Sequence, residues 1–291
     1  MRRFLHTAIA LAMLALPLAP GPATAQRIWW EPGLIEHVRF RALLRVGVGM
    51  FEPWVMCDRS GDLIGYEIDL ARRLAEDIGV RVEFVRMNWQ HIIPALVDGR
   101  FDVIVSGMSI TPARSLLVNF SEPYSEFGTA IVANIGLTPG FASVEDFNRA
   151  DVTFAARRGT TAEALVKREF PEAMLLAFDT DAEVVDAVTS GAAHATAADE
   201  VMAARSIHEY PNVLHRPFDT LFDQLPQAIA MRRSDGDALN YLDSWVRHYR
   251  VNGWLAERWH YWFETRDWEG LAASGSAQRG CAASFDETAS E

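Results

Sequence analysis

The chain has 291 residues, 49% of them hydrophobic and 23% charged, with a formal net charge of -12 at pH 7. That length suits one large domain or two modest ones, and the hydrophobic share is ample for a packed core. The acidic balance argues against nucleic-acid binding, because proteins that bind nucleic acids gather positive charge to meet the phosphates. We take the acidity as a contribution to solubility.

The first residues have the layout of a secretory signal. Two arginines form a basic start, residues 4–18 are mostly apolar, and residues 23–25 give a small-x-small cleavage site before Gln26. The apolar run is short for a membrane span and prolines follow it at once, which disfavours an anchor. No cysteine lies at the site, so nothing suggests a lipid anchor. We predict that residues 1–25 are a cleaved signal peptide and that the mature protein is soluble and periplasmic.

Strand-like and helix-like segments alternate along the first half of the chain, as they do in α/β proteins. The spacing of apolar residues predicts helices over 66–78 and 92–97 and strands over 43–48 and 80–84. The apolar run within 101–106 predicts an interior parallel strand. Together these segments form one βαβαβ unit.

A second α/β unit begins after the segment 124–134. Its expected strands cover 152–155, 192–197 and 228–231, and its expected helices cover 161–170, a stretch that ends at Gly191 and a longer stretch that ends at Gly253.

A lone arginine follows the strand at 101–106. The chain there passes through Ser106, Gly107, Met108 and Ser109 to a Thr-Pro turn and then to Arg114. Ligands of open α/β sheets bind at the carboxyl ends of the strands, where free N–H groups, a hydroxyl and a guanidinium suit a small carboxylate. Taken alone, Arg114 fits a surface position on the following helix better, but the segments around it reverse that preference.

Seven short segments carry a family resemblance. They are Gly65 to Ala71, Ile93 to Leu96, Gly99 to Asp102, Ser106 to Arg114, Phe120 to Tyr124, Gly159 to Glu163 and Asp199 to Val201. In this order and spacing they resemble the polar amino-acid-binding group of periplasmic solute-binding proteins, which serve ABC importers. The resemblance covers roughly Leu43 to Phe263 and is more specific for the fold than for the ligand.

The resemblance implies an α/β fold of two lobes, each a mostly parallel sheet flanked by helices. The chain would cross between the lobes twice, near residues 126–128 and 223–227. The expected parts are lobe one at 26–126 plus 228–271, lobe two at 127–227, and a small, polar, disordered tail at 272–291.

The resemblance also implies roles for polar residues around a free amino acid between the lobes. Arg114 would clamp the ligand carboxylate, with help from Ser109 and the amides near Gly107. Thr161 would begin a helix whose N-terminus favours the same carboxylate, and Asp199 would hold the ligand ammonium. Two plainer readings stay open. Thr160 and Glu163 fit a capping box, and Asp199 fits a helix N-cap.

Aromatic residues match the positions where the family packs groups against the ligand side chain, although ordinary core packing is the alternative. Basic amino-acid binders carry an acidic residue just before the equivalent of Phe51, where this chain has Gly49-Met50 with Glu52 adjacent. By contrast, the segment 199–201 resembles the histidine and basic amino-acid binders, so the ligand stays open. The full candidate set is Phe51, Trp54, Trp89, Ser106, Gly107, Met108, Ser109, Arg114, Thr161 and Asp199.

A second resemblance points to an enzyme on the same fold. Residues 253–263 and 34–46 are similar to segments of periplasmic cyclohexadienyl dehydratases, which act on prephenate or arogenate, but these are packing segments. Catalysis would need a buried carboxylic acid, for which Glu163 is the candidate. Residues 110–114 look like the transport binders, so we favour a binding protein with no catalytic residue. An accessory protein of a periplasmic dehydrogenase is a third reading.

The remaining expectations concern the cysteines and the partners. Cys57 and Cys281 could pair in an exported protein, but Cys281 falls in the expected tail, so we expect two free thiols. Their spacing fits no metal site, and we expect no metal or cofactor. The expected partners are a small amino acid or carboxylate ligand and an ABC permease of the inner membrane. No nucleic acid is expected, and the protein is expected to be a monomer.

Overall fold

A computed structural model describes residues 32–265, 267–273, 277–278 and 281. The predicted signal peptide, residues 1–25, lies outside this part of the chain. None of the helices within the described ranges combines the length and the hydropathy that crossing a bilayer requires.

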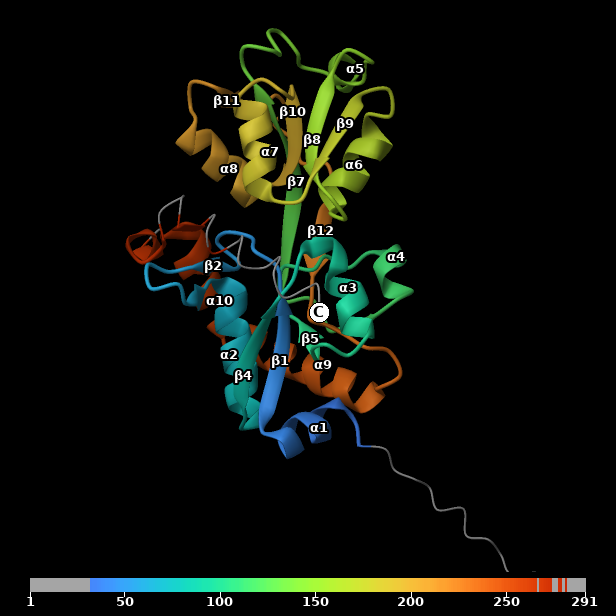
Figure 1. Cartoon of the computed structure of the whole chain (residues 1–291), viewed down its shortest axis with the longest axis vertical. Helices are drawn as coiled ribbons and strands as arrows, with labels where there is room; N and C mark the ends of the chain where they lie inside the picture. The colour runs from blue at the N-terminus through green and yellow to red at the C-terminus, as the bar shows by residue number, and fades with distance from the viewer. Residues whose placement is uncertain (1–31, 266, 274–276, 279–280, 282–291) are drawn as a thin grey trace, which may run out of the picture. The chain divides into compact units, whose positions relative to one another are not determined.

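The first lobe is built on a mixed sheet of five strands in the order β4-β1-β5-β13-β6 (Figure 1). β1 pairs in parallel with β4 and β5, whereas β13 and β6 join antiparallel. The strands are β1 (Leu43–Val48), β4 (Arg81–Arg86), β5 (Val103–Ile104), β6 (Asn119–Phe120) and β13 (Ala230–Met231), and the main helices are α2 (Tyr66–Ile78), α3 (Trp89–Val97) and α9 (Gly236–Val251).

Helix α2 illustrates how local sequence sets these elements. Ile68, Ala71, Leu74 and Ala75 are all buried and lie on one face of the helix. Gly79 ends the helix with a φ of 80°, a left-handed conformation that glycine adopts without a Cβ clash. The bounds predicted from the sequence are confirmed.

The second lobe is built on another mixed sheet, in the order β11-β7-β10-β8-β9. β8 pairs in parallel with β10 and β9, and β7 is antiparallel to β10 and β11. The strands are β7 (Ser125–Asn134), β8 (Thr153–Arg157), β9 (Met174–Phe178), β10 (Ala195–Asp199) and β11 (Leu214–His215), and the main helices are α6 (Thr161–Glu169), α7 (Asp181–Thr189) and α8 (Glu200–Glu209). The expected mostly parallel sheets are therefore mixed, because β7 in this sheet and β13 and β6 in the first run against their neighbours.

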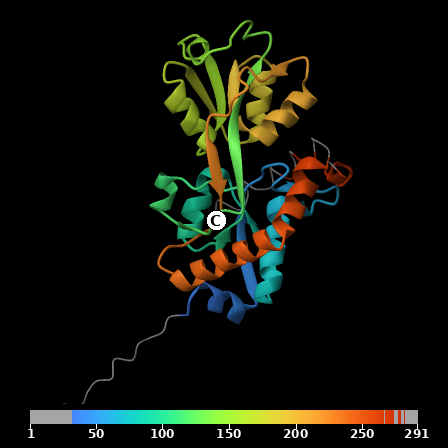
Figure 2. The same cartoon turned by 180° about the vertical axis from the view of Figure 1, so that it is seen from behind.

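Two strands connect the lobes. The first residues of β7 pair antiparallel with β12 (Gln224–Gln227), from Ser125 opposite Gln227 to Gly128 opposite Gln224. Figures 1 and 2 show this two-stranded ribbon running between the sheets, with β7 in green and β12 in orange. Its position agrees with the two crossings expected near 126–128 and 223–227. The lobe boundaries themselves stay a prediction.

The smaller elements fill the loops and the C-terminal end. They are α1 (Leu34–Arg41), β2 (Met56–Cys57), β3 (Leu63–Ile64), α4 (Pro112–Ser115), α5 (Val144–Phe147), α10 (Trp254–Trp259), a π-helix at His260–Glu264 and a 3-10 helix at Asp267–Gly270.

The tryptophan-rich end of the chain packs against the first lobe. Trp262 is buried and donates its indole N–H to Asp69 at 2.8 Å. Trp259 stacks on Phe127 with ring centroids 4.6 Å apart, and Phe127 lies on the connecting ribbon. The packing role expected for residues 253–263 is confirmed at these two tryptophans.

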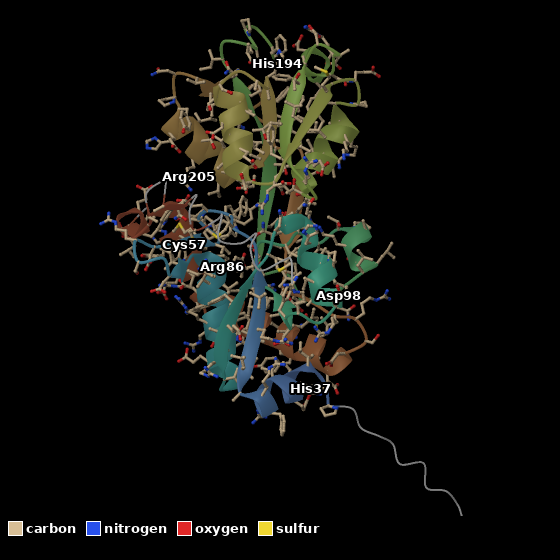
Figure 3. The ribbon with its side chains drawn as sticks, viewed as in Figure 1. His37, Cys57, Arg86, Asp98, His194 and Arg205 are labelled. Carbon is tan, nitrogen blue, oxygen red and sulfur yellow. A yellow bond between two sulfur atoms is a disulfide. The ribbon has the colours of Figure 1, made fainter. Side chains whose placement is uncertain are left out.

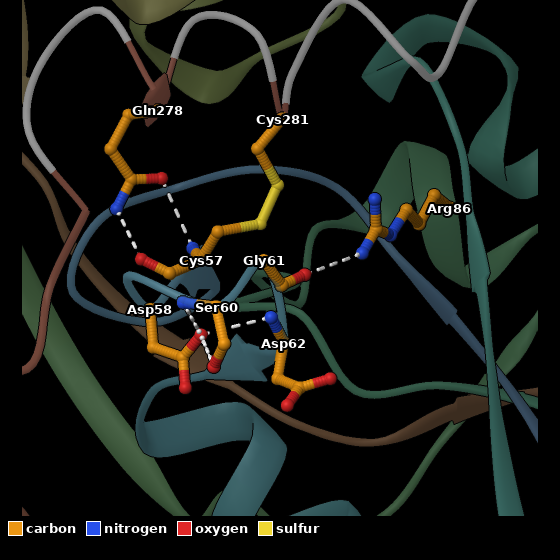
Figure 4. Close-up of a disulfide and its surroundings, with 8 residues drawn as sticks. All are labelled: Cys57, Asp58, Ser60, Gly61, Asp62, Arg86, Gln278 and Cys281. Atoms are coloured by element: carbon orange, nitrogen blue, oxygen red, sulfur yellow. Dashed lines mark hydrogen bonds between the residues drawn. A yellow bond between two sulfur atoms is a disulfide. The ribbon is translucent and has the colours of Figure 1, made fainter.

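The expectation of two free thiols is wrong. Cys57 and Cys281 form a disulfide (Figure 4). Gln278 reinforces it by accepting from the Cys57 N–H at 3.0 Å and donating to the Cys57 carbonyl at 2.7 Å. Ala273 donates to the same carbonyl at 3.0 Å. The described residues of the expected tail are therefore attached to the first lobe, because a covalent bond and backbone contacts offset their low apolar content.

We expect peptide mapping of the untreated protein under non-reducing conditions to recover Cys57 and Cys281 in one linked peptide. Replacing both cysteines by serine should lower the free energy of unfolding by about 2–4 kcal/mol, because the link restricts the unfolded chain. Denaturant unfolding with and without reductant measures the effect, and the double variant should show no reductant dependence. Free thiols that label in the folded, untreated protein would contradict the pairing.

Candidate ligand-binding cleft

A cleft with about 770 Å³ of space, part of it open to solvent, is lined by residues of both lobes. Seven predicted site residues line it: Phe51, Trp89, Gly107, Ser109, Arg114, Thr161 and Asp199. The cleft lies at the carboxyl ends of parallel strands, where α/β sheets bind ligands. Asp199 ends β10, and the loop after β5 leads to Ser109 and Arg114.

Arg114 carries a charge in this cleft that no acidic side chain of the described residues balances. Thr111 caps the short helix α4 by accepting from the Arg114 N–H at 3.2 Å. The guanidinium donates to the carbonyl oxygens of Ser109 at 3.0 Å and Gly159 at 3.1 Å, and burial lowers the pKa of Arg114 to about 10. It makes no ion pair with any described residue. A neutral carbonyl leaves the charge available to an anion.

The N-terminus of α6 adds favourable polarity for the same anion. Thr160, Thr161 and Ala162 all line the cleft. The Thr160 hydroxyl caps the helix by accepting from the Glu163 N–H at 3.2 Å, and it donates to the Arg157 carbonyl at 2.7 Å. The first N–H groups of a helix have no intrahelical acceptor and sit at its positive end. Thr160 is therefore the N-cap, but the expected capping box is only half formed, because the Glu163 carboxylate accepts from the Gly159 N–H instead of the Thr160 N–H. The cap leaves room for anion binding.

Asp199 is both the N-cap of α8 and a buried carboxylate with a raised pKa. Its Oδ1 accepts from the N–H groups of Val201 and Met202, both at 3.0 Å, so the N-cap interpretation is correct. Burial raises the pKa of Asp199 to about 7 against the lowering effect of the Met202 N–H, and the charge of Asp181 adds to the rise. Oδ2 receives no hydrogen bond from another described residue. A cation at Oδ2 would stabilise the ionised form.

Three predicted residues lie behind the cleft surface instead of lining it. Trp54 is fully buried and stacks on Phe51 with centroids 4.3 Å apart. Ser106 is buried, and its hydroxyl accepts from the Gly49 N–H at 2.9 Å and donates to the Gly49 carbonyl at 3.1 Å. Met108 packs in the core cluster that contains Trp89. These side chains support the cleft wall, because each points into the core.

Glu163, the candidate acid for an enzyme, does not line the cleft. Its carboxylate accepts from the Gly159 N–H and from Lys167, both at 2.7 Å. Partial burial acts to raise its pKa, but these two hydrogen bonds and the charges of Lys167 and Arg158 lower the pKa overall. A carboxylate so held is a poor proton donor.

Sequence reasoning missed Arg157 and Asp181, which also line the cleft and pair at 2.7 Å. The expected strand stopped at Ala155, whereas β8 continues to Arg157. An arginine at the carboxyl end of an apolar parallel strand is the signal that could have revealed it.

Contacts from several elements cross the cleft. The Trp89 indole N–H donates to the Gly159 carbonyl at 3.2 Å, the same oxygen that Arg114 contacts. Arg205 on α8 pairs with Glu52 at 2.7 Å, and Figure 3 shows Arg205 on the side of the second lobe that faces the first. Among the described residues, no group of His, Cys, Asp and Glu is arranged to hold a metal ion.

Two α/β lobes, two connecting strands and a charged cleft lined by both lobes form the two-lobed architecture of periplasmic-binding proteins. Residues 44–265 match the bacterial extracellular solute-binding proteins, family 3. The chain belongs to this family.

Known relatives include both binders and an enzyme. The chain is 26% identical to a cyclohexadienyl dehydratase of Pseudomonas aeruginosa over 91% of this chain and 97% of that protein. A binding component of an ABC transporter from Wolinella succinogenes, solved with lysine, is 34% identical with a TM-score of 0.73 over 79% of this chain and 99% of that one. An ancestral amino-acid-binding protein, a precursor of cyclohexadienyl dehydratase, is 34% identical with a TM-score of 0.73 over 80% of this chain and 100% of that one.

We expect Arg114→Ala to weaken ligand binding by roughly 2–5 kcal/mol, because a desolvated carboxylate loses its charged partner. Folding should change little, since the Arg114 guanidinium donates to two neutral carbonyls and forms no ion pair with a described residue. Isothermal titration gives the affinity and thermal unfolding checks the fold. Arg149→Ala, the same change at an exposed pair with Asp151, is the matched control. Unchanged affinity in folded Arg114→Ala would assign the residue a structural role.

Proposed function

We propose that this protein is the periplasmic substrate-binding component of an ABC importer, and that it captures a free α-amino acid or a closely related carboxylate. One observation carries the proposal. Arg114 has no carboxylate partner, and Oδ2 of Asp199 has no donor from another residue, within the described chain. A free α-amino acid brings the anion and the cation that these two groups lack.

The charge pattern supports a zwitterion over a simple carboxylate. A carboxylate alone would satisfy Arg114 and the N-terminus of α6 but would leave Asp199 without a cation. An ammonium beside Asp199 favours its ionised form and offsets its burial. The aromatic faces of Phe51 and Trp89 then suit the carbon chain of the ligand.

The site residues and the partners are part of the same proposal. Arg114, Ser109 and the Gly107 amide would hold the carboxylate with Thr161, and Asp199 would hold the ammonium. A permease in the inner membrane would receive the ligand. The protein would act as a monomer, after cleavage of its signal peptide, residues 1–25. Membership in an extracellular family supports this location.

A dehydratase that acts on prephenate or arogenate is the second candidate. Similarity to the Pseudomonas enzyme over nearly the whole of both chains favours it. The reaction needs an acid that protonates the leaving hydroxyl. Glu163 is unsuited, since Lys167 and Gly159 hold its carboxylate. Asp199 is the better acid, because burial raises its pKa to about 7.

We expect saturating ligand to reduce the radius of gyration, since bonds to groups on both lobes favour closure about the ribbon of β7 and β12. Small-angle scattering with and without ligand measures the change. Arg114→Ala at the same ligand concentration should stay at the unliganded value. A wild-type radius that is constant under proven saturation would contradict hinge closure.

A panel of amino acids, prephenate and arogenate separates the two candidates. As a binder, the protein should gain melting temperature with at least one amino acid, because a ligand that binds only the folded state stabilises it. Prephenate should then decay at its uncatalysed rate.

Turnover would reverse that conclusion. Formation of phenylpyruvate above the uncatalysed rate, lost in Asp199→Asn and kept in Glu163→Gln, would identify a dehydratase instead. The Glu163→Gln variant is the matched control, because it removes a carboxylate that does not line the cleft.

A further inference from the structure

A second arginine in the cleft, Arg157, is only partly used by the protein. Its Nη1 donates to the Met50 carbonyl at 2.9 Å and to Oδ2 of Asp181 at 2.7 Å. The side chain is 8% exposed, so it is largely withdrawn from water. Nε is buried and has no hydrogen-bond partner among the described residues. The described residues also provide no acceptor for Nη2.

The unused edge of Arg157 has the geometry of an anion-binding fork. Nε and Nη2 lie on one side of the planar guanidinium and donate in parallel, as they do when an arginine binds a carboxylate with two hydrogen bonds. A buried N–H without an acceptor costs free energy, and the pair with Asp181 leaves that cost in place. Arg157 lines the cleft, but its Nε is closed to water in this structure, so a ligand can supply the missing acceptor where the cleft opens around the guanidinium.

The position of Arg157 relative to Arg114 fits the far end of an amino acid. The two guanidinium carbons lie 5.5 and 5.7 Å from the centroid of the same Trp89 ring, so they are at most about 11 Å apart. With its α-carboxylate at Arg114, a ligand of the size of glutamate or glutamine can direct its side-chain tip to Arg157.

We infer that Arg157 and Asp181 form a second subsite that selects amino acids whose side chain ends in an oxygen acceptor, either a carboxylate or a carboxamide. The inference rests on the proposed function, because it takes the α-carboxylate to lie at Arg114. A cationic tip is disfavoured, since Asp181 is already paired and Arg157 repels the tip. This ligand class differs from that of the lysine-bound relative.

Isothermal titration of the wild-type protein with glutamate, glutamine, methionine and lysine tests the selection. Glutamate or glutamine should bind about tenfold to a hundredfold more tightly than methionine, which is similar in length but lacks the oxygen. Lysine should bind no better than methionine. Equal or tighter binding of methionine or lysine overturns the inference and leaves the proposed function intact. If none of the four binds, the inference is overturned, and the wider panel of amino acids and carboxylates then decides the proposed function.

Substitution tests the assignment to Arg157 itself. Arg157→Met should abolish the preference for the acceptor-tipped ligand over methionine. Arg158→Met, next in sequence and paired with Asp179 at the surface, is the matched control and should keep the preference. Arg157→Lys is the second variant, in case Arg157→Met does not fold. It retains the charge beside Asp181 but lacks the two-donor edge, so it should also lose the preference. A wild-type preference in folded Arg157→Met or in folded Arg157→Lys overturns the inference.

Asp181→Asn distinguishes the two kinds of tip. A ligand carboxylate should bind more tightly once the neighbouring negative charge is gone. A carboxamide should bind less tightly, because its N–H group loses a charged acceptor. An affinity that does not change in either direction would remove Asp181 from the subsite.

Discussion

The constraint on which this structure depends is the cost of holding charged groups in a cleft away from water. Arg114 stays charged at neutral pH even though burial lowers its pKa to about 10, and among the described residues it donates to carbonyl oxygens and lies over the Trp89 ring. Asp199 faces burial and the negative charge of Asp181. The neighbours of these groups offset only part of the cost, whereas a ligand with opposite charges offsets both at once. Ligand affinity and the stability of the liganded fold therefore have the same source.

The scaffold brings these charges together through strand ends. The loop after β5 carries Arg114, and β8 and β10 end at Arg157 and Asp199. The ribbon of β7 and β12 joins the two groups of strands, and Phe127 and Gly128 belong both to this ribbon and to the cleft wall. The proposed closure would rotate the backbone there and change the distance between Arg114 and Asp199, which would couple the hinge to the site.

Short sequence patterns predicted the features that depend on neighbouring residues, such as helix bounds and strand ends. The apolar spacing and Gly79 fixed the bounds of α2, and strand ends together with the family motifs led to Arg114 and Asp199. Motifs do not specify which side chains reach the cleft, so Trp54 was assigned to the cleft although it lies in the core. The disulfide joins positions 224 residues apart, and no spacing rule predicts such a pair. Arg157 was missed because its strand pairs with β9, a strand that the sequence analysis did not include.

The same cleft can serve a binder or an enzyme, and anion recognition does not separate the two. Prephenate carries two carboxylates and would suit Arg114 and Arg157 as well as an acidic amino acid would. The difference lies at Asp199, whose pKa near neutrality lets the ligand decide its protonation. An amino acid brings an ammonium and favours the carboxylate, which then acts as a binding group. Prephenate brings no ammonium, so the proton stays on Asp199, which is the condition that a general acid requires.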